Sequence, residues 1–185
     1  IFPMQTIRQR LHALLLLAAL TISLAVPASA AGSLPFTDVD PSEWYYTYVQ
    51  DLYDAGIVDG VTSTAFRPEG TVTFGQALKL VLMAAGYENQ APTGTHWASG
   101  FYDLAQREGL LPSGLNLGLD DAITRLEIAE ITVLAMDLSR TSQDPSPFDD
   151  TDAEAALILW DHGIFEGSAS GDQILFQPQD DISRA

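Results

Sequence analysis

Residues 122–135 read AITRLEIAEITVLA, which is the pattern of a capped amphipathic helix. Thr124 stands three residues before Glu127, the spacing at which an N-cap hydroxyl and a third-residue carboxylate satisfy each other's backbone donors. Apolar residues follow at helical spacing and form one stripe, which consists of Ile128, Ile131, Leu134, Ala135 and Leu138. The stretch therefore predicts a helix that begins after Thr124 and packs along one face.

The same helix start occurs on both sides of this stretch. Thr73 precedes Gln76 by three residues, and Ser183 follows an isoleucine as Thr124 does. The apolar stripe after Thr73 consists of Leu80, Val81 and Ala84. Seven residues before each hydroxyl lies a turn sequence: Phe66-Arg67-Pro68, Leu117-Gly118-Leu119 and Phe176-Gln177-Pro178. We therefore expect three copies of one unit, whose apolar stripes meet in one bundle.

A glycine followed by an aliphatic residue marks the first half of each copy. Gly56, Gly109 and Gly163 recur at intervals of 53 and 54 residues, and Trp44 and Trp97 each precede their glycine by 12. A glycine suits the left-handed position that ends a helix, so each copy is predicted to contain a first helix that ends there. The pattern predicts an all-α chain of helix-turn-helix repeats at residues 36–87, 95–138 and 148–185, called copies one, two and three below.

Capping residues predict where the first helices begin. In copy one Asp40, Pro41 and Glu43 have the order of an N-cap, a first-turn proline and a capping-box acid. Thr151 and Glu154 repeat the box in copy three. The predicted buried face of the first helix consists of Tyr45, Tyr48, Val49 and Leu52. Because the sequence stops at Ala185, copy three is expected to lack the stripe of its second helix.

The first thirty residues have the three-part layout of a secretory signal peptide. Arg8 and Arg10 precede an apolar run over residues 13–26, and Ala28-Ser29-Ala30 has the small residues of a cleavage site. Met4 is the natural start, with residues 1–3 as upstream read-through. The run is shorter than the roughly 20 residues of a membrane-spanning helix, and no second hydrophobic span follows. We predict export, with no transmembrane segment in the mature protein.

Charge and composition exclude several function classes. The chain carries 25 acidic and 8 basic residues, and this negative charge argues against nucleic acid as a partner. Because the chain has no cysteine, it forms no disulfides. His96 and His162 are isolated, and Ala169 stands where a nucleophile elbow needs serine, so no enzyme, cofactor or metal is predicted. The clusters Asp38 with Asp40 and Asp149, Asp150 with Asp152 lack an EF-hand loop and fit helix caps and solvated charge.

These anchors resemble the S-layer homology family, whose repeats carry an aromatic-x-Asp-Val opening, a Trp, a Gly-Ile pair, a Phe-x-Pro turn and a Thr-Arg-Ala-Glu signature. Copy two reads Thr124-Arg125-Leu126-Glu127 at the signature and copy three reads Ser183-Arg184-Ala185. Copy one departs from it with Thr73-Phe74-Gly75-Gln76. The resemblance covers Phe36 to Ala185.

The resemblance implies a pseudo-threefold, three-prong arrangement around a central helix bundle. It also implies the function: non-covalent anchoring of a secreted protein to the cell wall or surface layer through a secondary cell-wall polysaccharide, typically one bearing pyruvate ketals. The ligand would lie in grooves between neighbouring repeats. Self-assembly into a surface layer stays open.

The resemblance points to Arg125 and Arg184 as the principal ligand contacts. Each stands at the first position of a predicted helix, where a guanidinium can hold a carboxylate at two points. A surface arginine near a helix start is the alternative. Since Phe74 replaces the arginine in copy one, that groove is expected to be weak or silent unless Arg67 or Lys79 substitutes.

Four further residues are candidate ligand contacts. Trp44 and Trp97 offer flat indole surfaces for a sugar face, although helix-spaced aromatics are also typical of a core. Gly60 and Gly167 would let the backbone approach a ligand, although turn glycines fit the same positions. Two rival functions stay open: the anchoring part of a larger surface hydrolase whose catalytic domain follows Ala185, and a protein–protein assembly module.

Overall fold

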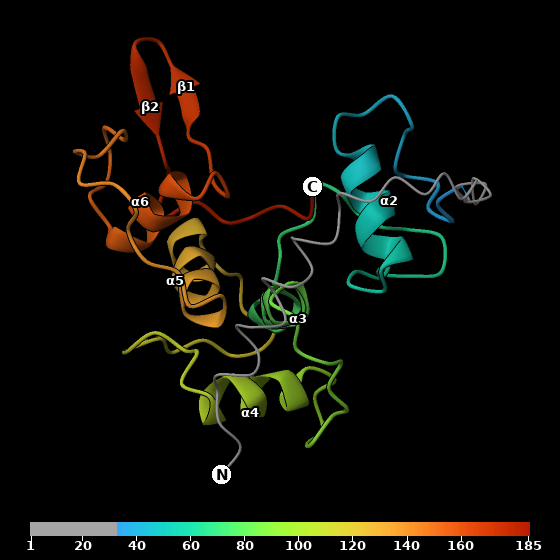
Figure 1. Cartoon of the computed structure of the whole chain (residues 1–185). Coiled ribbons are helices and arrows are strands. Elements are labelled where there is room, and N and C mark those ends of the chain that lie inside the picture. The colour runs from blue at the N-terminus through green and yellow to red at the C-terminus, as the bar shows by residue number, and fades with distance from the viewer. Residues whose placement is uncertain (1–32) are drawn as a thin grey trace, which may run out of the picture. The chain divides into compact units, whose positions relative to one another are not determined.

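The computed structural model describes residues 33–185, so the predicted signal peptide at residues 1–30 lies outside the described residues. The described chain is mostly helical, as predicted, with one short hairpin that the repeat pattern did not predict (Figure 1). Its elements are α2 (Tyr46–Asp54), α3 (Phe74–Ala84), α4 (Ser99–Arg107), α5 (Arg125–Ala135), α6 (Glu154–Asp161), β1 (Ser168–Ser170) and β2 (Gln173–Leu175). Within residues 33–185, no helix has the length and hydropathy needed to span a membrane.

Helices α3 and α5 begin where the capping pattern predicts. The Thr73 hydroxyl accepts a hydrogen bond from the Gln76 backbone N–H, and the Gln76 side chain accepts one from the Thr73 N–H. Thr124 and Glu127 make the same reciprocal pair at the start of α5. Both predicted capping boxes are therefore confirmed, and each satisfies two of the backbone donors that a helix start leaves free.

The two boxes predicted for the first helices are wrong. The Asp40 carboxylate accepts from the N–H and hydroxyl of Ser42, and α2 begins only at Tyr46. The Thr151 hydroxyl accepts from the N–H of Ala153, the uncapped start of α6. Both side chains bond a backbone N–H two residues on, which stabilises a turn and takes the acceptor away from the helix.

The buried face of the first helix is narrower than predicted. Tyr45 and Val49 are buried, as predicted, but Tyr48 is exposed. The glycines that follow the first helices behave as predicted, because Gly56, Gly109 and Gly163 have φ values of +70°, +70° and +65°. A side chain would meet no atom at these three positions, so the backbone conformation alone favours glycine there.

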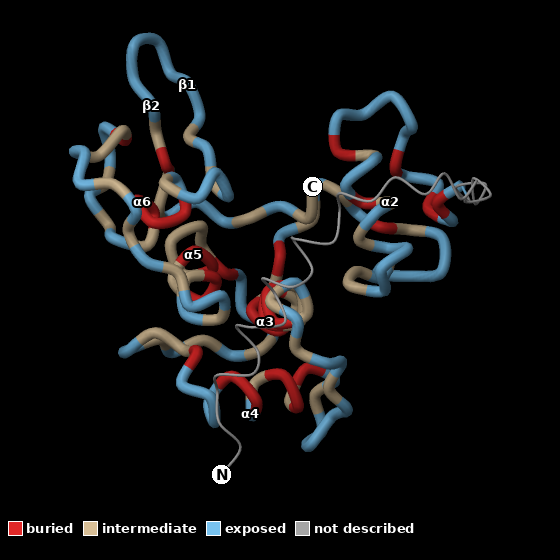
Figure 2. The backbone as a smooth tube through the Cα atoms, viewed as in Figure 1, coloured by how far each residue is buried: buried red, intermediate tan, exposed pale blue. Residues whose placement is uncertain are grey.

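The main core lies where α3 packs against α4 and α5, and α6 packs on the far side of α5. Figure 2 shows buried residues on α3 and α5 and also on α4 and α6, which pack against them. The buried side of α3 consists of Phe74, Ala77, Leu78, Val81 and Leu82. Ala84 of the predicted stripe is exposed, because α3 has two helical neighbours and buries a broader face, centred nearer its N-terminus, than the pattern indicated.

Two smaller clusters stabilise the outer parts of copies one and three. In copy one Phe36 packs against Phe66, with ring centres 5.4 Å apart, in a cluster with Tyr45 and Val49 of the α2 region. In copy three Phe148 packs against Phe176 at 5.3 Å, in a cluster with residues of α6. The aromatic residue that opens each of these copies therefore packs on the aromatic residue of its turn sequence.

Three isolated β-bridges join the segments that precede the second helices. Thr73 pairs with Ala122, Thr124 pairs with Asp181, and Ser183 pairs with Thr71. The residue after each hydroxyl adds a backbone bond: its N–H donates to Asp121, Asp180 and Gly70 respectively, at 2.8, 2.9 and 3.0 Å. These links run from copy one to copy two, from copy two to copy three, and from copy three back to copy one.

Candidate functional site

Arg184 reaches from copy three into copy one. Its Nε donates to the backbone carbonyl of Phe66 at 2.7 Å, and its Nη2 donates to that of Asp59 at 2.8 Å. The guanidinium carbon lies 4.4 Å from the centre of the Phe66 ring. Two of the five guanidinium donors therefore hold the two copies together, and the planar group stacks on an aromatic face.

Arg125 makes the equivalent contact between copies two and three. Its Nε donates to the carbonyl of Phe176 at 2.7 Å, and its Nη2 lies 3.4 Å from the carbonyl of Glu166. The guanidinium carbon lies 5.1 Å and 5.2 Å from the rings of Phe176 and Phe165. Both predicted arginines are thus half-buried and hydrogen-bond a neighbouring copy, which differs from the alternative of a surface arginine near a helix start.

Burial lowers the pKa of both arginines, because a charged group loses hydration inside a protein. Asp180 and Asp150 oppose this effect on the pKa of Arg125, and Asp38 and Asp59 oppose it on that of Arg184. The guanidinium nevertheless stays charged at neutral pH, since its ordinary pKa lies far above neutrality. Each arginine is therefore a fixed positive charge in an acidic protein.

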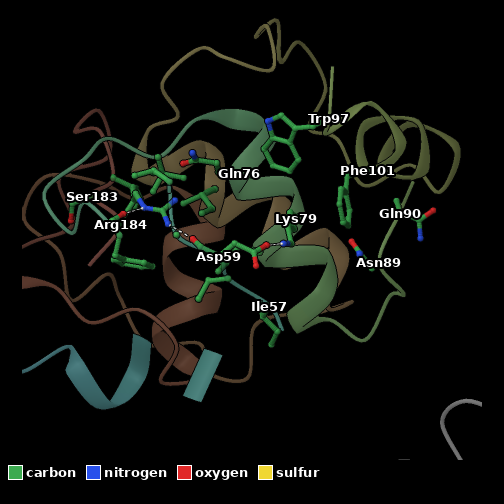
Figure 3. Close-up of a pocket in the computed structure, with 18 residues that line it drawn as sticks. Ile57, Asp59, Gln76, Lys79, Asn89, Gln90, Trp97, Phe101, Ser183 and Arg184 are labelled. Carbon is green, nitrogen blue, oxygen red and sulfur yellow. Dashed lines mark hydrogen bonds and ion pairs between the residues drawn. The ribbon is translucent and has the colours of Figure 1, made fainter. Parts of the chain in front are cut away.

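Arg184 stands at one end of a cavity of about 490 Å³, drawn in Figure 3 and called the Arg184 groove below. Three of the predicted site residues, Arg184, Trp97 and Gly60, line this groove together. The other lining residues come from the segments before and within α3, from α4 and α5, from the connection between copies one and two, and from residues 182–183 of copy three. The groove thus combines cationic, aromatic and polar side chains, and all three copies contribute to its lining.

Two further polar residues of α3 line the same groove. Gln76 and Lys79 stand three residues apart and therefore share a face of the helix. The Lys79 ammonium forms an ion pair with the Asp59 carboxylate, with Nζ and Oδ2 2.5 Å apart. The sequence suggested Lys79 only as a substitute for the missing arginine of copy one, whereas Lys79 lies in the groove with Arg184. Helical spacing from the capping residue Thr73 is the signal that could have placed it on this face.

Phe74 occupies the signature position of copy one and is part of the core. Its side chain is 1% exposed and meets the Tyr102 ring edge-on, with ring centres 6.2 Å apart. The contact joins copies one and two through apolar packing, where the two arginines use hydrogen bonds. Arg67 does not line the Arg184 groove, and its backbone N–H donates to the Asp38 carboxylate in the turn sequence of copy one.

Neither candidate tryptophan belongs to the core. Trp97 is 45% exposed, lines the Arg184 groove, and lies beside His96 with ring centres 5.6 Å apart. Trp44 is 73% exposed, and its ring meets Tyr45 and Tyr48 edge-on. The core alternative for these indoles is therefore wrong, because both side chains are exposed.

Gly60 and Gly167 occupy equivalent tight positions. A Cβ at Gly60 would lie 2.3 Å from the Thr62 carbonyl oxygen and 2.5 Å from the Phe36 ring. A Cβ at Gly167 would lie 2.3 Å from a methyl carbon of Ile174 and 3.0 Å from the Phe148 ring. Packing inside the copy thus accounts for glycine at both positions. Gly60 also lines the Arg184 groove, and Gly167 lines a second cavity of about 340 Å³.

The second cavity lies in copy three beside the hairpin. It is lined by Trp160, Gly163, Phe165, Glu166, Gly167, Ala169 and Ile174. Arg125 borders this region, because its Nη2 faces the Glu166 carbonyl and its guanidinium stacks on Phe165. Arg184, Gly60 and Trp97 therefore line one cavity, and Arg125 lies beside the cavity that Gly167 lines. Trp44 lines neither cavity.

The acidic residues that open copies one and three stabilise turns. Asp38 accepts from the N–H groups of Phe66 and Arg67, both at 2.8 Å. Asp150 accepts from those of Phe176 and Gln177, at 2.8 and 2.7 Å. Desolvation would raise the pKa of Asp38, but these hydrogen bonds outweigh it and the pKa is lowered. Among residues 33–185, no group of three or more possible metal ligands comes together.

Comparison with known families supports the first part of the chain directly. Residues 35–78 match the S-layer homology domain family. The matched segment includes Asp59, Gly60, Phe66 and the start of α3, so one wall of the Arg184 groove lies within it.

Three relatives carry related sequence. An endoglucanase from Bacillus sp. (strain KSM-635) is 25% identical over 92% of this chain and 20% of its own length. The surface-layer 125 kDa protein of Lysinibacillus sphaericus is 28% identical over 62% of this chain and 11% of its own. A cell surface protein of Thermoanaerobacter kivui is 31% identical over 56% of this chain and 13% of its own. The chain thus spans a fifth or less of each relative's length.

Proposed function

We propose that this chain anchors an exported protein non-covalently to the bacterial cell wall by binding a polysaccharide attached to peptidoglycan. The match of residues 35–78 to the S-layer homology domain family and two relatives that are surface proteins support a location at the cell surface. The signal peptide predicted at residues 1–30 would direct the export. In this proposal the chain is not itself an enzyme and needs no cofactor.

The Arg184 groove carries the proposal. Arg184 and Lys79 bring two positive charges to a protein with 25 acidic residues, so an anionic ligand would be held by local charges and not by a general field. Trp97 adds an indole face of the kind that packs against a sugar ring. A polysaccharide with carboxylate substituents, such as pyruvate ketals, offers both the apolar ring face and the anion.

We further propose that copies one, two and three form a pseudo-threefold module. The cyclic order of the three β-bridges supports this arrangement, as do the equivalent contacts of Arg125 and Arg184. Arg125 would then serve a second, smaller groove with Gly167. Trp44 occupies in copy one the position that Trp97 has in copy two, so it is a third candidate contact for sugar.

Co-sedimentation with peptidoglycan sacculi tests the function. The exported protein is mixed with sacculi before and after extraction of the attached polysaccharide, and we expect binding only before extraction. Binding that survives extraction would point to peptidoglycan itself. Binding to neither preparation would contradict the proposal and favour an assembly module that recognises a protein.

A matched pair of variants tests the site. Arg184→Ala should weaken binding to untreated sacculi at least tenfold, because a hydrogen bond to a charged group contributes about 1.5–3 kcal/mol. Arg107→Ala removes an arginine whose side chain is largely exposed on α4, outside the groove, and should bind as the parent protein does. Equal losses in both variants would mean that general charge, and not the groove, holds the polymer.

A second candidate function differs only in what is anchored. The endoglucanase relative aligns with 92% of this chain but is about five times as long, so a sequence of this kind occurs there beside much additional protein. We therefore consider this chain as the anchoring part of a larger surface hydrolase. Sequencing the gene downstream of Ala185 tests this, since a catalytic domain in frame would support it and a stop codon would contradict it. Self-assembly into a surface layer would instead appear as ordered sheets of purified protein in electron micrographs.

A further inference from the structure

We propose that Lys79 is a second anion-binding group of the Arg184 groove and that Asp59 is a built-in competitor, whose carboxylate a ligand carboxylate displaces. The proposal rests on the proposed function, because it names how that groove receives an anion. It assigns specificity for an anion to Lys79 and a limit on affinity to Asp59. Neither role follows from the presence of Arg184.

Asp59 contacts both cations of the groove through different atoms. Its backbone carbonyl accepts from Arg184 Nη2 at 2.8 Å, and its carboxylate Oδ2 lies 2.5 Å from Lys79 Nζ (Figure 3). The arginine therefore bonds the backbone of Asp59, whereas the Asp59 carboxylate hydrogen-bonds the lysine and acts on Arg184 only through its charge. Rotation of that side chain would free the ammonium without moving the backbone or breaking the arginine contact.

Lys79 is much less exposed than Asp59, which favours exchange of the Asp59 carboxylate for a ligand carboxylate. The Lys79 side chain is 17% exposed and the Asp59 side chain is 72% exposed. A mostly buried ammonium needs an anionic partner, so Lys79 favours some carboxylate beside it at all times. A carboxylate that is largely in water loses little when it leaves, because exposed ion pairs contribute little to stability. A ligand carboxylate can therefore take the place of Asp59 on Lys79.

The equivalent positions of α5 carry two carboxylates, and no lysine. Glu127 and Glu130 stand where α3 has Gln76 and Lys79, counted from the capping threonines. Burial raises the pKa of Glu130, and the neighbouring charge of Glu127 raises it further. A carboxylate ligand would be repelled there, so the recognition of an anion by lysine is specific to the groove beside α3.

Equilibrium binding of the exported protein to solubilised wall polysaccharide tests the proposal, with a carboxyl-reduced form of the same polymer as the second probe. Asp59→Asn removes the competing charge and keeps the backbone carbonyl, and we expect about two- to fivefold tighter binding of the untreated polymer. Asp172→Asn makes the same charge change on the exposed turn of the hairpin and should leave affinity unchanged. Equal gains in both variants would overturn the competitor role.

Two lysine variants complete the test. Lys79→Gln should weaken binding about tenfold and reduce the preference for the untreated over the reduced polymer, and Lys79→Arg should restore part of both. If the parent protein binds the polymer and Lys79→Gln binds as well, the inference is wrong and the proposed function stands.

Titration with acetate, followed by the amide NMR signals of Gln76 and Lys79, separates the inference from the function. We expect acetate to shift these signals more strongly in Asp59→Asn than in the parent, and not in Lys79→Gln. Failure of the polymer to bind while acetate behaves as expected would contradict the proposed function and keep the anion site. Identical acetate responses in all three proteins would overturn the inference.

Discussion

Phe74 and Arg184 occupy equivalent positions, one residue after the hydroxyl that precedes the second helix, and they join neighbouring copies in opposite ways. Phe74 is buried against Tyr102 of copy two, whereas Arg184 hydrogen-bonds two carbonyls of copy one and lines an open cavity. The backbone links beside them are the same, since both residues donate an N–H to the neighbouring copy. The comparison shows that this position joins neighbouring copies with either an apolar or a charged side chain.

The largest effect is expected at the apolar member of the pair. Phe74→Ala should lower the free energy of unfolding by about 3–4 kcal/mol, because it removes a buried aromatic ring and leaves a cavity between α3 and α4. Urea unfolding followed by circular dichroism measures the change. A loss below about 1 kcal/mol would mean that α4 closes over the cavity and that the joint does not depend on this ring.

The two arginines should be smaller contributors to stability. Arg184→Ala and Arg125→Ala are each expected to cost about 1.5–2 kcal/mol, since each removes a charged donor from the carbonyl of Phe66 or Phe176. Thermal unfolding checks the cost, and sacculus binding checks the second role. We expect the Arg184 variant to lose more binding than the Arg125 variant, because only Arg184 shares its groove with Lys79 and Trp97. Equal binding losses with unchanged stability would reduce both arginines to ligand contacts.

Acidification should weaken the turn that Asp38 stabilises through the N–H groups of Phe66 and Arg67. The pKa of Asp38 is lowered in the folded state, so its contribution to stability is present above the ordinary pKa of about 4 and is lost as the pH falls below that value. Asp38→Asn should therefore cost about 1 kcal/mol at pH 7 and almost nothing near pH 2. Urea midpoints of the parent and variant between pH 2 and 7 measure this. A difference that stays constant with pH would contradict the assigned charge.

The smallest loss of stability is expected at the N-caps of α3 and α5, and it should be equal at both. Thr73→Ala and Thr124→Ala each remove an N-cap from a capping box, and each should cost about 1 kcal/mol. The caps are the same although the following residues, Phe74 and Arg125, differ. Matched Ser variants should recover most of the stability in both cases. Unequal costs would show that the contact between copies, and not only the helix cap, depends on the threonine hydroxyl.

The amino-acid sequence by itself determined features that depend on neighbours along the chain. The capping boxes at Thr73 and Thr124 and the left-handed glycines after the first helices follow from backbone donors and φ preferences over a few residues. The recurrence of these signals was enough to predict helical repeats. The same local logic misplaced the starts of α2 and α6, because an aspartate or threonine also stabilises a turn and the surrounding packing decides between the two.

Only the tertiary structure decided which residues of different copies meet. The stacking of Arg184 on Phe66, the ion pair of Lys79 with Asp59, and the position of Trp97 in the same groove join residues that lie far apart in the chain. Sequence spacing carries no information on such contacts, since they depend on how α3, α4 and α5 pack. The same packing buried Phe74 and left both candidate tryptophans exposed, because burial depends on which surfaces the neighbouring copies cover.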